Sequence, residues 1–426
     1  MNRNQIIYQT YVRILQRELI SAMGCTEPIA VAYCAAYARS VLGILPDKVT
    51  VEASGNIIKN VKSVIVPNTG GRKGIAAAAC IGILGGDENA ALEVISKVSP
   101  EVKEQLGAYM EKTRTEVKPL NSEYILDLIV TVCSGNDSAS VRIANEHTNI
   151  IRVERNGEVL LEKDPNTDEK QEDTPDYSLL TVKDIYDFAT TCELEDAEDI
   201  LNRQIAQNTA IADEGLRNDY GANIGKVLLK TNNDLRTRAK AYAAAGSDAR
   251  MNGCELPVVI CSGSGNQGLT ASLPVITYAR ELNCSKEKLY RALLISCLIT
   301  IHLKAGIGRL SAYCGAVSAG AGAGAGIAYL LDGAIEEISH TIVNALAITS
   351  GIVCDGAKSS CAAKIATAVE TGIFGYEMFK NGQQFYGGDG LVVTGVEKSI
   401  EQFARLARIG MRETDREIIL MMTEQA

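Results

Sequence analysis

The amino-acid sequence predicts an α+β fold, with a mixed N-terminal domain followed by a mostly helical domain. Residues 1–165 alternate between helical and strand-like hydrophobic patterns, whereas residues 179–426 follow a helical period almost throughout. Between them, residues 166–178 belong to an acidic, polar, proline-containing stretch that is typical of a linker. A chain of 426 residues is long enough for two domains, each with its own hydrophobic core.

The N-terminal domain is expected to begin with two helices, at residues 4–20 and 28–43. The second opens after "GCTEP" with Pro28 in its first turn, where the missing amide proton costs no helical hydrogen bond. "DKVTVEASG" and "KSVIVPNTG", residues 47–55 and 62–70, alternate as strands do, and the glycine-bounded "GRKGIAAAACIGILGG" after them predicts a helix.

Residues 124–162 alternate as strands and contain the hairpin turn signal Asn156-Gly157, so they predict a small antiparallel sheet. The rest of the chain is expected to be helical, ending in a charged amphipathic segment from about residue 396. Before that segment, helices are expected at 182–190, 195–214, 220–248, 268–282, 286–303, 311–331, 334–350 and 361–379.

Composition and charge exclude several classes of protein. The net charge is −10 and no cluster of Lys and Arg forms a basic patch, so a nucleic-acid partner is not expected. The N-terminus has no unbroken apolar stretch of the kind that signal peptides carry, which favours a cytoplasmic location. The least polar run, residues 311–331, is mostly Gly and Ala and favours a buried helix over a membrane span. Assembly of the chain into a homo-oligomer is left open.

Twelve cysteines in a chain without a secretory signal are expected to be mostly reduced, and most of them to pack as small apolar residues. Cys314, Cys354 and Cys361 differ because all three fall at predicted helix ends, where backbone amides and the helix dipole favour a thiolate. Cys25 lies at or just before another helix start. The spacing C-x39-C-x6-C matches neither zinc sites nor ferredoxins, so spacing alone leaves simple packing as an alternative.

The glycine-rich "SGSGNQG", residues 262–268, precedes a predicted helix and could bind a carboxylate through its backbone amides. An ordinary helix-start loop is the alternative. The spacing does not match a dinucleotide fingerprint, and none of the three histidines has zinc-ligand spacing. Asn266 in this loop and Lys304 are the candidate substrate-binding residues.

Four segments, "GCTEPIA", "SGSGNQGLTASLPV", "AGIGRLSAYCGAVSAG" and "GIVCDGAKSSCAAKI", resemble the L-cysteine desulfidase family, single-chain relatives of the iron-sulfur L-serine dehydratases. They occur in the family's order, and the resemblance covers nearly the whole chain. It implies a [4Fe-4S] cluster held by Cys314, Cys354 and Cys361, although the last two are closer in sequence than in the dehydratases. It also implies that Cys25 is the catalytic base or, alternatively, a cluster ligand.

The implied reaction is the elimination of sulfide from L-cysteine, giving pyruvate, ammonia and hydrogen sulfide. Three cysteine ligands would leave one iron open to act as a Lewis acid on the leaving group. A thiolate at Cys25, with its pKa lowered at a helix N-terminus, would remove the α proton. This assignment requires Cys25 to lie near the other three cysteines in the fold.

Three alternatives stay open. The same site could dehydrate L-serine, because hydroxide and sulfide leave by related chemistry. The chain could instead be a cluster-free amino-acid-binding or structural protein whose cysteines only pack. A pyridoxal-phosphate lyase could catalyse the same reaction, but no lysine lies in a convincing phosphate-binding context.

Overall fold

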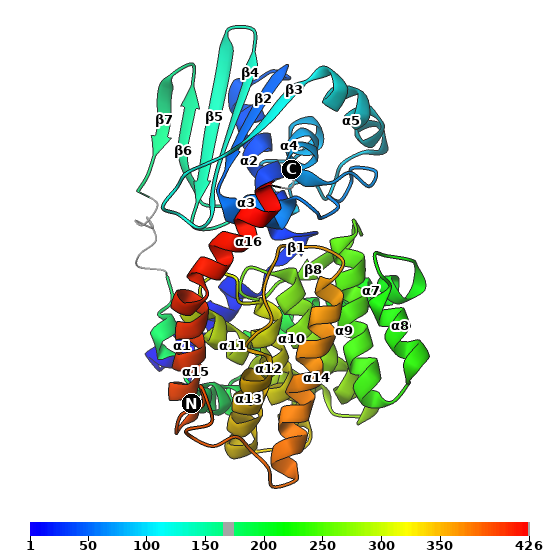
Figure 1. Ribbon diagram of the computed structural model, residues 1–426, viewed down its shortest axis with the longest axis vertical. Coiled ribbons are helices and arrows are strands. Elements are labelled where there is room, and N and C mark those ends of the chain that lie inside the picture. Colours follow the sequence, from blue (N-terminus) through cyan, green and yellow to red (C-terminus); the bar gives the residue numbers. More distant parts are fainter. Residues whose placement is uncertain (165–173, 425–426) are drawn as a thin grey trace.

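The computed structural model describes residues 1–164 and 174–424, which form two bodies stacked along the long axis of the molecule (Figure 1). The sheet body (residues 24–164) combines a six-stranded sheet with helices, and the helical body (residues 1–23 and 174–411) is almost entirely helical. The predicted α+β fold is therefore confirmed. Most of the predicted acidic linker, residues 166–173, lies outside the described residues.

The sheet has the strand order β3-β2-β4-β5-β6-β7, in which only the β2–β3 pair is parallel. Helices α2 and α4 cover one of its faces, so strand side chains alternate between buried and partly exposed. The strands are β2 (Lys48–Ala53), β3 (Arg114–Pro119), β4 (Asp127–Ser134), β5 (Asp137–Ala144), β6 (Ile150–Arg155) and β7 (Glu158–Glu162). The helices of this body are α2 (Thr26–Leu42), α3 (Gly55–Val61), α4 (Gly74–Gly85) and α5 (Pro100–Lys112).

Two details of the predicted sheet are wrong. The antiparallel strands of residues 124–162 are extended by β2 and β3 into a mixed sheet. Residues 62–70 are not a strand, because the chain turns back on itself through Asn68, Gly70 and Gly71, which all have positive φ. As a result, the amide of Val66 donates to the carbonyl of Arg72 within the turn, and among the described residues the segment forms only isolated bridges, from Ile65 to Lys73 and to Asn252.

The helical body is built around α12, which packs against α10, α11, α13 and α14. The predicted helix 220–248 is two helices, α8 and α9, because Asp234 caps a new helix by accepting a hydrogen bond from Thr237. The helices are α1 (Ile6–Glu18), α6 (Val182–Thr191), α7 (Glu198–Arg217), α8 (Ile224–Thr231), α9 (Leu235–Met251), α10 (Gly265–Glu281), α11 (Lys286–Ile307), α12 (Gly315–Leu330), α13 (Ile335–Thr349), α14 (Cys361–Lys380), α15 (Val396–Arg405) and α16 (Arg412–Glu424). Short turns of helix occupy Ala91–Glu93, Tyr177–Leu179, Leu194–Asp196 and, with π geometry, Leu406–Gly410.

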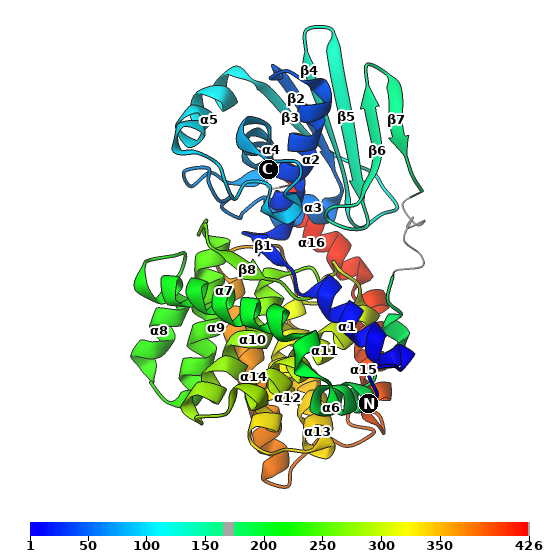
Figure 2. The same cartoon turned by 180° about the vertical axis from the view of Figure 1, so that it is seen from behind.

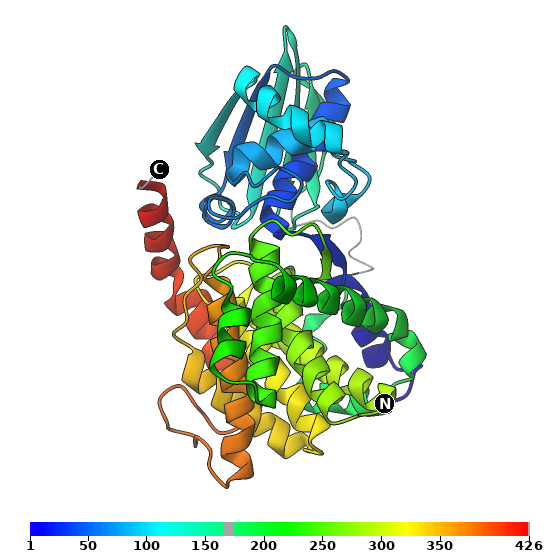
Figure 3. The same cartoon turned by 90° about the vertical axis from the view of Figure 1, so that its right-hand side faces the viewer.

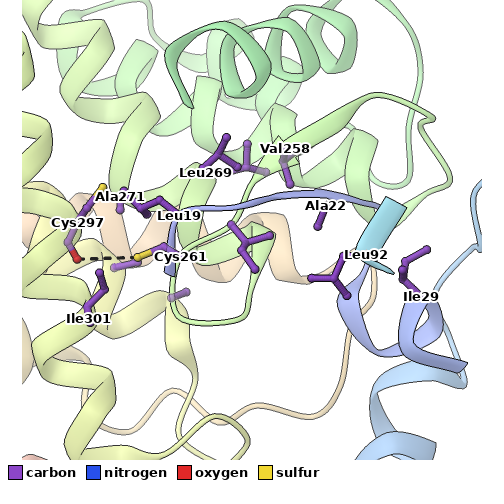
Figure 4. Close-up of a cluster of buried hydrophobic side chains, with 14 of the residues drawn as sticks. Leu19, Ala22, Ile29, Leu92, Val258, Cys261, Leu269, Ala271, Cys297 and Ile301 are labelled. Carbon is purple, nitrogen blue, oxygen red and sulfur yellow. Dashed lines mark hydrogen bonds between the residues drawn. The ribbon is translucent and has the colours of Figure 1, made fainter. Parts of the chain in front are cut away.

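The N-terminal segment lies with the helical body (Figure 2). Tyr8 and Tyr11 of α1 pack edge-on against Phe188 of α6, with ring centroids 5.1 and 5.3 Å apart. Strand β1 (Ser21–Met23) pairs with β8 (Pro257–Val259), so the chain enters the sheet body only after Met23. Apolar side chains from β1, α2 and α10 form a continuous core across this junction (Figure 4). The domain boundary at residue 165 stays a prediction.

Helix α16 returns from the helical body to the sheet body (Figure 3). Its Asp415 accepts a hydrogen bond from the fully buried Lys59 of α3, at 2.6 Å, and another from Asn56. At Gly55 a Cβ atom would lie 2.7 Å from Ile419, so α16 and α3 are in close contact. The two bodies are therefore tied together at both ends of the chain.

The Gly-Ala run of α12 allows a close approach to α14. A Cβ atom at Gly320 would lie 2.3 Å from the carbonyl oxygen of Ala368, and one at Gly372 would lie 2.1 Å from that of Gly320. Both contacts are closer than side-chain carbons tolerate, so the two helices pack backbone to backbone. This matters for the site described below, because α12 and α14 both begin at it.

We expect Gly320→Ala to destabilise the protein by roughly 2 kcal/mol, because the new methyl group overpacks this crossing. Thermal unfolding should then begin about 5 °C lower. The matched control is Gly351→Ala, where a Cβ atom meets nothing within 4 Å. Equal midpoints for the two variants would show that the α12–α14 crossing is not tightly packed.

Among the described residues, one helix is long and apolar enough to span a membrane by length and composition. It is α11, and 78% of its qualifying window is buried inside the protein. This burial is what a core helix of a compact protein shows.

Candidate active site

A cavity of about 100 Å³ lies where the two bodies meet, and both contribute to its lining. Cys25 comes from the start of α2 in the sheet body, while the other predicted site residues come from the helical body. The structure brings all six predicted residues to this cavity: Cys25, Asn266, Lys304, Cys314, Cys354 and Cys361. A second cavity, of about 430 Å³, adjoins it and shares Ser262, Lys304 and Arg309 with it.

Cys314 and Cys354 are carried by two loops that hydrogen-bond to each other. The amide of Cys314 donates to the carbonyl of Ile352 at 3.1 Å, and the amide of Cys354 donates to that of Ala312 at 2.6 Å. Cys314 is the N-terminal cap residue of α12, and Cys354 follows α13. The two thiols are thus fixed by backbone pairing.

Cys361 is the first residue of α14, and its thiol faces the loop that precedes the helix, 3.6 Å from the carbonyl oxygen of Gly356. Gly356 has φ +89°, and a Cβ atom there would lie 2.2 Å from the carbonyl oxygen of Lys59 in the sheet body. Only glycine fits this position, so the loop between Cys354 and Cys361 is pressed against α3.

The expectation that helix ends stabilise thiolates here is wrong. Burial raises the pKa of Cys314 to about 12, and the neighbouring Cys354 adds to the rise. Burial likewise raises the pKa of Cys361, despite the opposing effects of a backbone amide and Lys358. At Cys314 and Cys361, desolvation of the anion therefore outweighs the helix dipole, and a positively charged ligand would favour their thiolates.

Within residues 1–164 and 174–424, no three side chains of His, Cys, Asp or Glu converge as ligands of a single metal ion. Cysteines that hold an iron-sulfur cluster do not need to converge in this way, because each binds a different iron atom. Cys314, Cys354 and Cys361 all line the cavity, and their three sulfurs are a donor set that suits such a cluster.

Cys25 is the N-terminal cap residue of α2, and its thiol donates to Glu27 Oε2 at 3.0 Å. The hydroxyl of Thr26 donates to the same oxygen and to the carbonyl of Gly263, which links α2 to the glycine-rich loop. Burial, and next the charge of Glu27, raise the pKa of Cys25 well above its usual value. The predicted lowering of this pKa is therefore wrong, and Cys25 is held as a thiol.

Glu27 is a buried carboxylate at the centre of this group. Burial alone would raise its pKa, but the neighbouring His147 and the thiol of Cys25 outweigh burial and lower the pKa to about 2. His147 Nε2 is 3.9 Å from Glu27 Oε1 and has no hydrogen-bond partner among the described residues. Asn60 donates to the same oxygen at 3.3 Å. Glu27 therefore carries a negative charge beside Cys25.

Part of the cavity lining is cationic. Lys304 is buried, and burial lowers its pKa to about 8 although Cys354 and Cys314 oppose this change. Its amino group donates to the carbonyl of Arg309 at 3.4 Å. Asn266 accepts a hydrogen bond from Arg250, at 3.1 Å. This part of the lining can bind an anionic group next to the cysteines.

The sequence did not single out Arg250, Glu27 or His147 as site residues. Glu27 lies inside the "GCTEP" segment, two residues after Cys25, and this proximity is a signal that could have identified it. Arg250 and His147 stand in segments without a motif, and only the fold brings them to the cavity.

The pattern of the family described as "Serine dehydratase alpha chain" matches residues 89–420. Several full-length relatives, all called UPF0597 proteins, are similar to this chain. One from Desulfitobacterium hafniense is 56% identical over 426 residues, covering 100% of this chain and 99% of the relative. One from Lachnoclostridium phytofermentans is 51% identical and covers 98% and 100%, and one from Treponema denticola is 44% identical and covers 99% of both chains.

Proposed function

The chain belongs to the serine dehydratase alpha chain family, and from this premise we propose that it eliminates sulfide from L-cysteine, giving pyruvate, ammonia and hydrogen sulfide. Membership makes it a lyase of the dehydratase type. The observation that carries the finer proposal is that Cys314, Cys354, Cys361 and Cys25 line one cavity. The sequence resemblance to the L-cysteine desulfidases supports the choice of substrate.

Cys314, Cys354 and Cys361 would hold a [4Fe-4S] cluster. Three soft sulfur donors, each partly buried and each a free cysteine, fit the needs of such a group. When bound, the cluster supplies a Lewis-acidic iron to the leaving group of the substrate. Its positive iron atoms would also offset the burial that raises the pKa of Cys314 and Cys361.

Cys25 is our candidate for the group that removes the α proton. Its hydrogen bond to Glu27 fixes the position of the sulfur. The sulfur must lose its proton before it can act as a base; the charge of Arg250 favours this loss by lowering the pKa of Cys25, whereas Glu27, with its pKa lowered to about 2, is too weak a base to keep the proton. Loss of the α proton leaves an electron pair that forms the Cα=Cβ double bond as the Cβ–S bond breaks. The resulting aminoacrylate hydrolyses in water to pyruvate and ammonia.

Lys304 and Asn266 stand in the cationic part of the cavity lining, where they would help to orient the substrate. The cavity lies between the two bodies, and side chains of both line it. A cytoplasmic location, the absence of a nucleic-acid or membrane partner, and assembly into a homo-oligomer stay predictions.

Dehydration of L-serine is the second candidate function, and the family description favours it. We expect the anaerobically prepared protein to convert both amino acids by the same site, with kcat/KM at least about tenfold higher for L-cysteine, because a soft sulfur leaving group suits an iron Lewis acid better than hydroxide does. Pyruvate and sulfide are measured in parallel. A higher kcat/KM for L-serine would replace the desulfidase proposal with a dehydratase. Release of neither product would leave the cluster-free binding protein as the better description.

A further inference from the structure

Among the residues that the structure describes, Arg250 is the largest fully buried side chain, with 1% of its surface exposed, and it lines the cavity. It is the second-last residue of α9. Its Nη1 donates to Asn266 Oδ1 at 3.1 Å, whereas Nε and Nη2 have no hydrogen-bond partner among the described residues. No described carboxylate forms an ion pair with it.

Burying a guanidinium without an anionic partner costs folding free energy, because the group loses its hydrogen bonds to water and gains few interactions in their place. The fully buried Lys59, by contrast, has an acidic partner, because it pairs with Asp415 at 2.6 Å. The free donors of Arg250 therefore indicate a missing anionic ligand. Because Arg250 lines the cavity, that ligand belongs in the cavity.

The N-terminus of α10 supplies further donors at the same place. The backbone amides of residues 265–267 have no acceptor within the described chain, and the buried hydroxyl of Ser262 has no partner either. Arg250 lies directly over this helix start, because a Cβ atom at Gly265 would be only 2.2 Å from its Nε. Guanidinium, hydroxyl and helix amides together form a receptor for an anion with planar, paired oxygens.

We propose that Arg250, with the N-terminus of α10, binds the α-carboxylate of the amino-acid substrate. This deepens the proposed function and rests on it for the identity of the substrate. It restricts the substrate to amino acids with a free carboxylate and excludes their amides, esters and decarboxylated amines. Asn266 is then a positioning residue, since its Oδ1 is engaged by Arg250 and its Nδ2 faces the sulfur of Met251 at 3.5 Å.

The test measures binding of L-alanine, which has no leaving group, to the anaerobically prepared cluster-containing protein by calorimetry. We expect Arg250→Met to weaken L-alanine binding about 100-fold. Arg250→Lys keeps the positive charge but loses the planar guanidinium that can donate two parallel hydrogen bonds, and it should weaken binding about tenfold. L-Alaninamide should bind the wild type as weakly as L-alanine binds Arg250→Met. The matched control is Arg238→Met on the same helix, whose arginine pairs with Glu281 near the surface. This control should bind L-alanine like the wild type.

Two readouts separate this role from a structural one. Without ligand, Arg250→Met should unfold at the same temperature as the wild type or higher, because it removes an uncompensated buried charge. Adding Asn266→Ala to Arg250→Met should cause no further loss of L-alanine binding, because Asn266 acts through Arg250. A lower unfolding temperature together with unchanged L-alanine binding would overturn the proposal.

The other candidate anion is the cluster itself, and the experiment distinguishes it. If Arg250 only balanced the negative charge of the cluster and its thiolate ligands, Arg250→Met would lose iron but keep its affinity for L-alanine. That result would overturn the proposed role of Arg250 in carboxylate binding. If the chain is no lyase, L-alanine binding that depends on Arg250 still supports the receptor. If Arg250→Met turns over L-cysteine with unchanged KM, Arg250 does not bind the substrate carboxylate, and the proposed function stands.

Discussion

Replacing Cys354 by alanine is expected to abolish both the cluster and the elimination of sulfide. The two remaining cysteines, Cys314 and Cys361, are too few ligands to retain the cluster. The iron content should therefore fall from about four per chain to about one or none. Activity should fall to the level of the iron-free protein. Iron analysis and sulfide release are measured on the variant and the wild type, both prepared without oxygen.

The matched control is Cys284→Ala. Cys284 is also a partly exposed free cysteine at a helix boundary, but it does not line the cavity. It should keep the iron and the activity of the wild type. Full activity of Cys354→Ala would remove the cluster from the mechanism, whatever its iron content.

Cys25→Ala is expected to retain the cluster and to lose catalysis. If Cys25 removes the α proton, kcat should fall by about 10²- to 10⁴-fold, because that is what a positioned proton-transfer group contributes. Exchange of the α proton of L-alanine with deuterated water should be lost as well. Nuclear magnetic resonance follows the exchange, and the iron content should stay near four per chain.

Cys34→Ala on the same helix is the control for this variant. Cys34 is equally buried, but its thiol donates to the carbonyl of Val141 in the sheet and lies away from the cavity. It should leave both kcat and proton exchange unchanged. Loss of iron in Cys25→Ala would instead identify Cys25 as a ligand of the cluster, against its role as the base.

The helical half of the fold was predictable because its elements are long and periodic. The predicted ranges 286–303 and 334–350 correspond to α11 and α13 with small differences at their ends. The segment at residues 62–70 was not predictable in this way. Its apolar alternation is that of a strand, but a local turn closed by Val66 and Arg72 ends it, and its one long-range bridge, from Ile65 to Asn252, joins residues that are distant in sequence.

The candidate site could be predicted only through the resemblance. The spacing of Cys314, Cys354 and Cys361 carries no motif, and the matching segments were needed to select them among twelve cysteines. The fold then places the selected residues around one cavity together with Cys25.

Local sequence could not predict the electrostatics of the site. A helix start favours a thiolate, but the depth of burial at Cys25 and Cys314 depends on how the two bodies close over them. For the same reason the sequence gives no sign of Arg250. Its two unpartnered nitrogen atoms become visible only when every neighbour in the fold is known.

The most direct measurement is stepwise reconstitution of the iron-free protein under anaerobic conditions, with L-cysteine turnover followed at each iron content. We predict that sulfide and pyruvate are released in equal amounts, and that the rate rises with the cluster content to a maximum at about four irons per chain. Turnover of L-cysteine by the iron-free protein at the maximal rate would contradict the assignment of Cys314, Cys354 and Cys361 as ligands of a catalytic cluster.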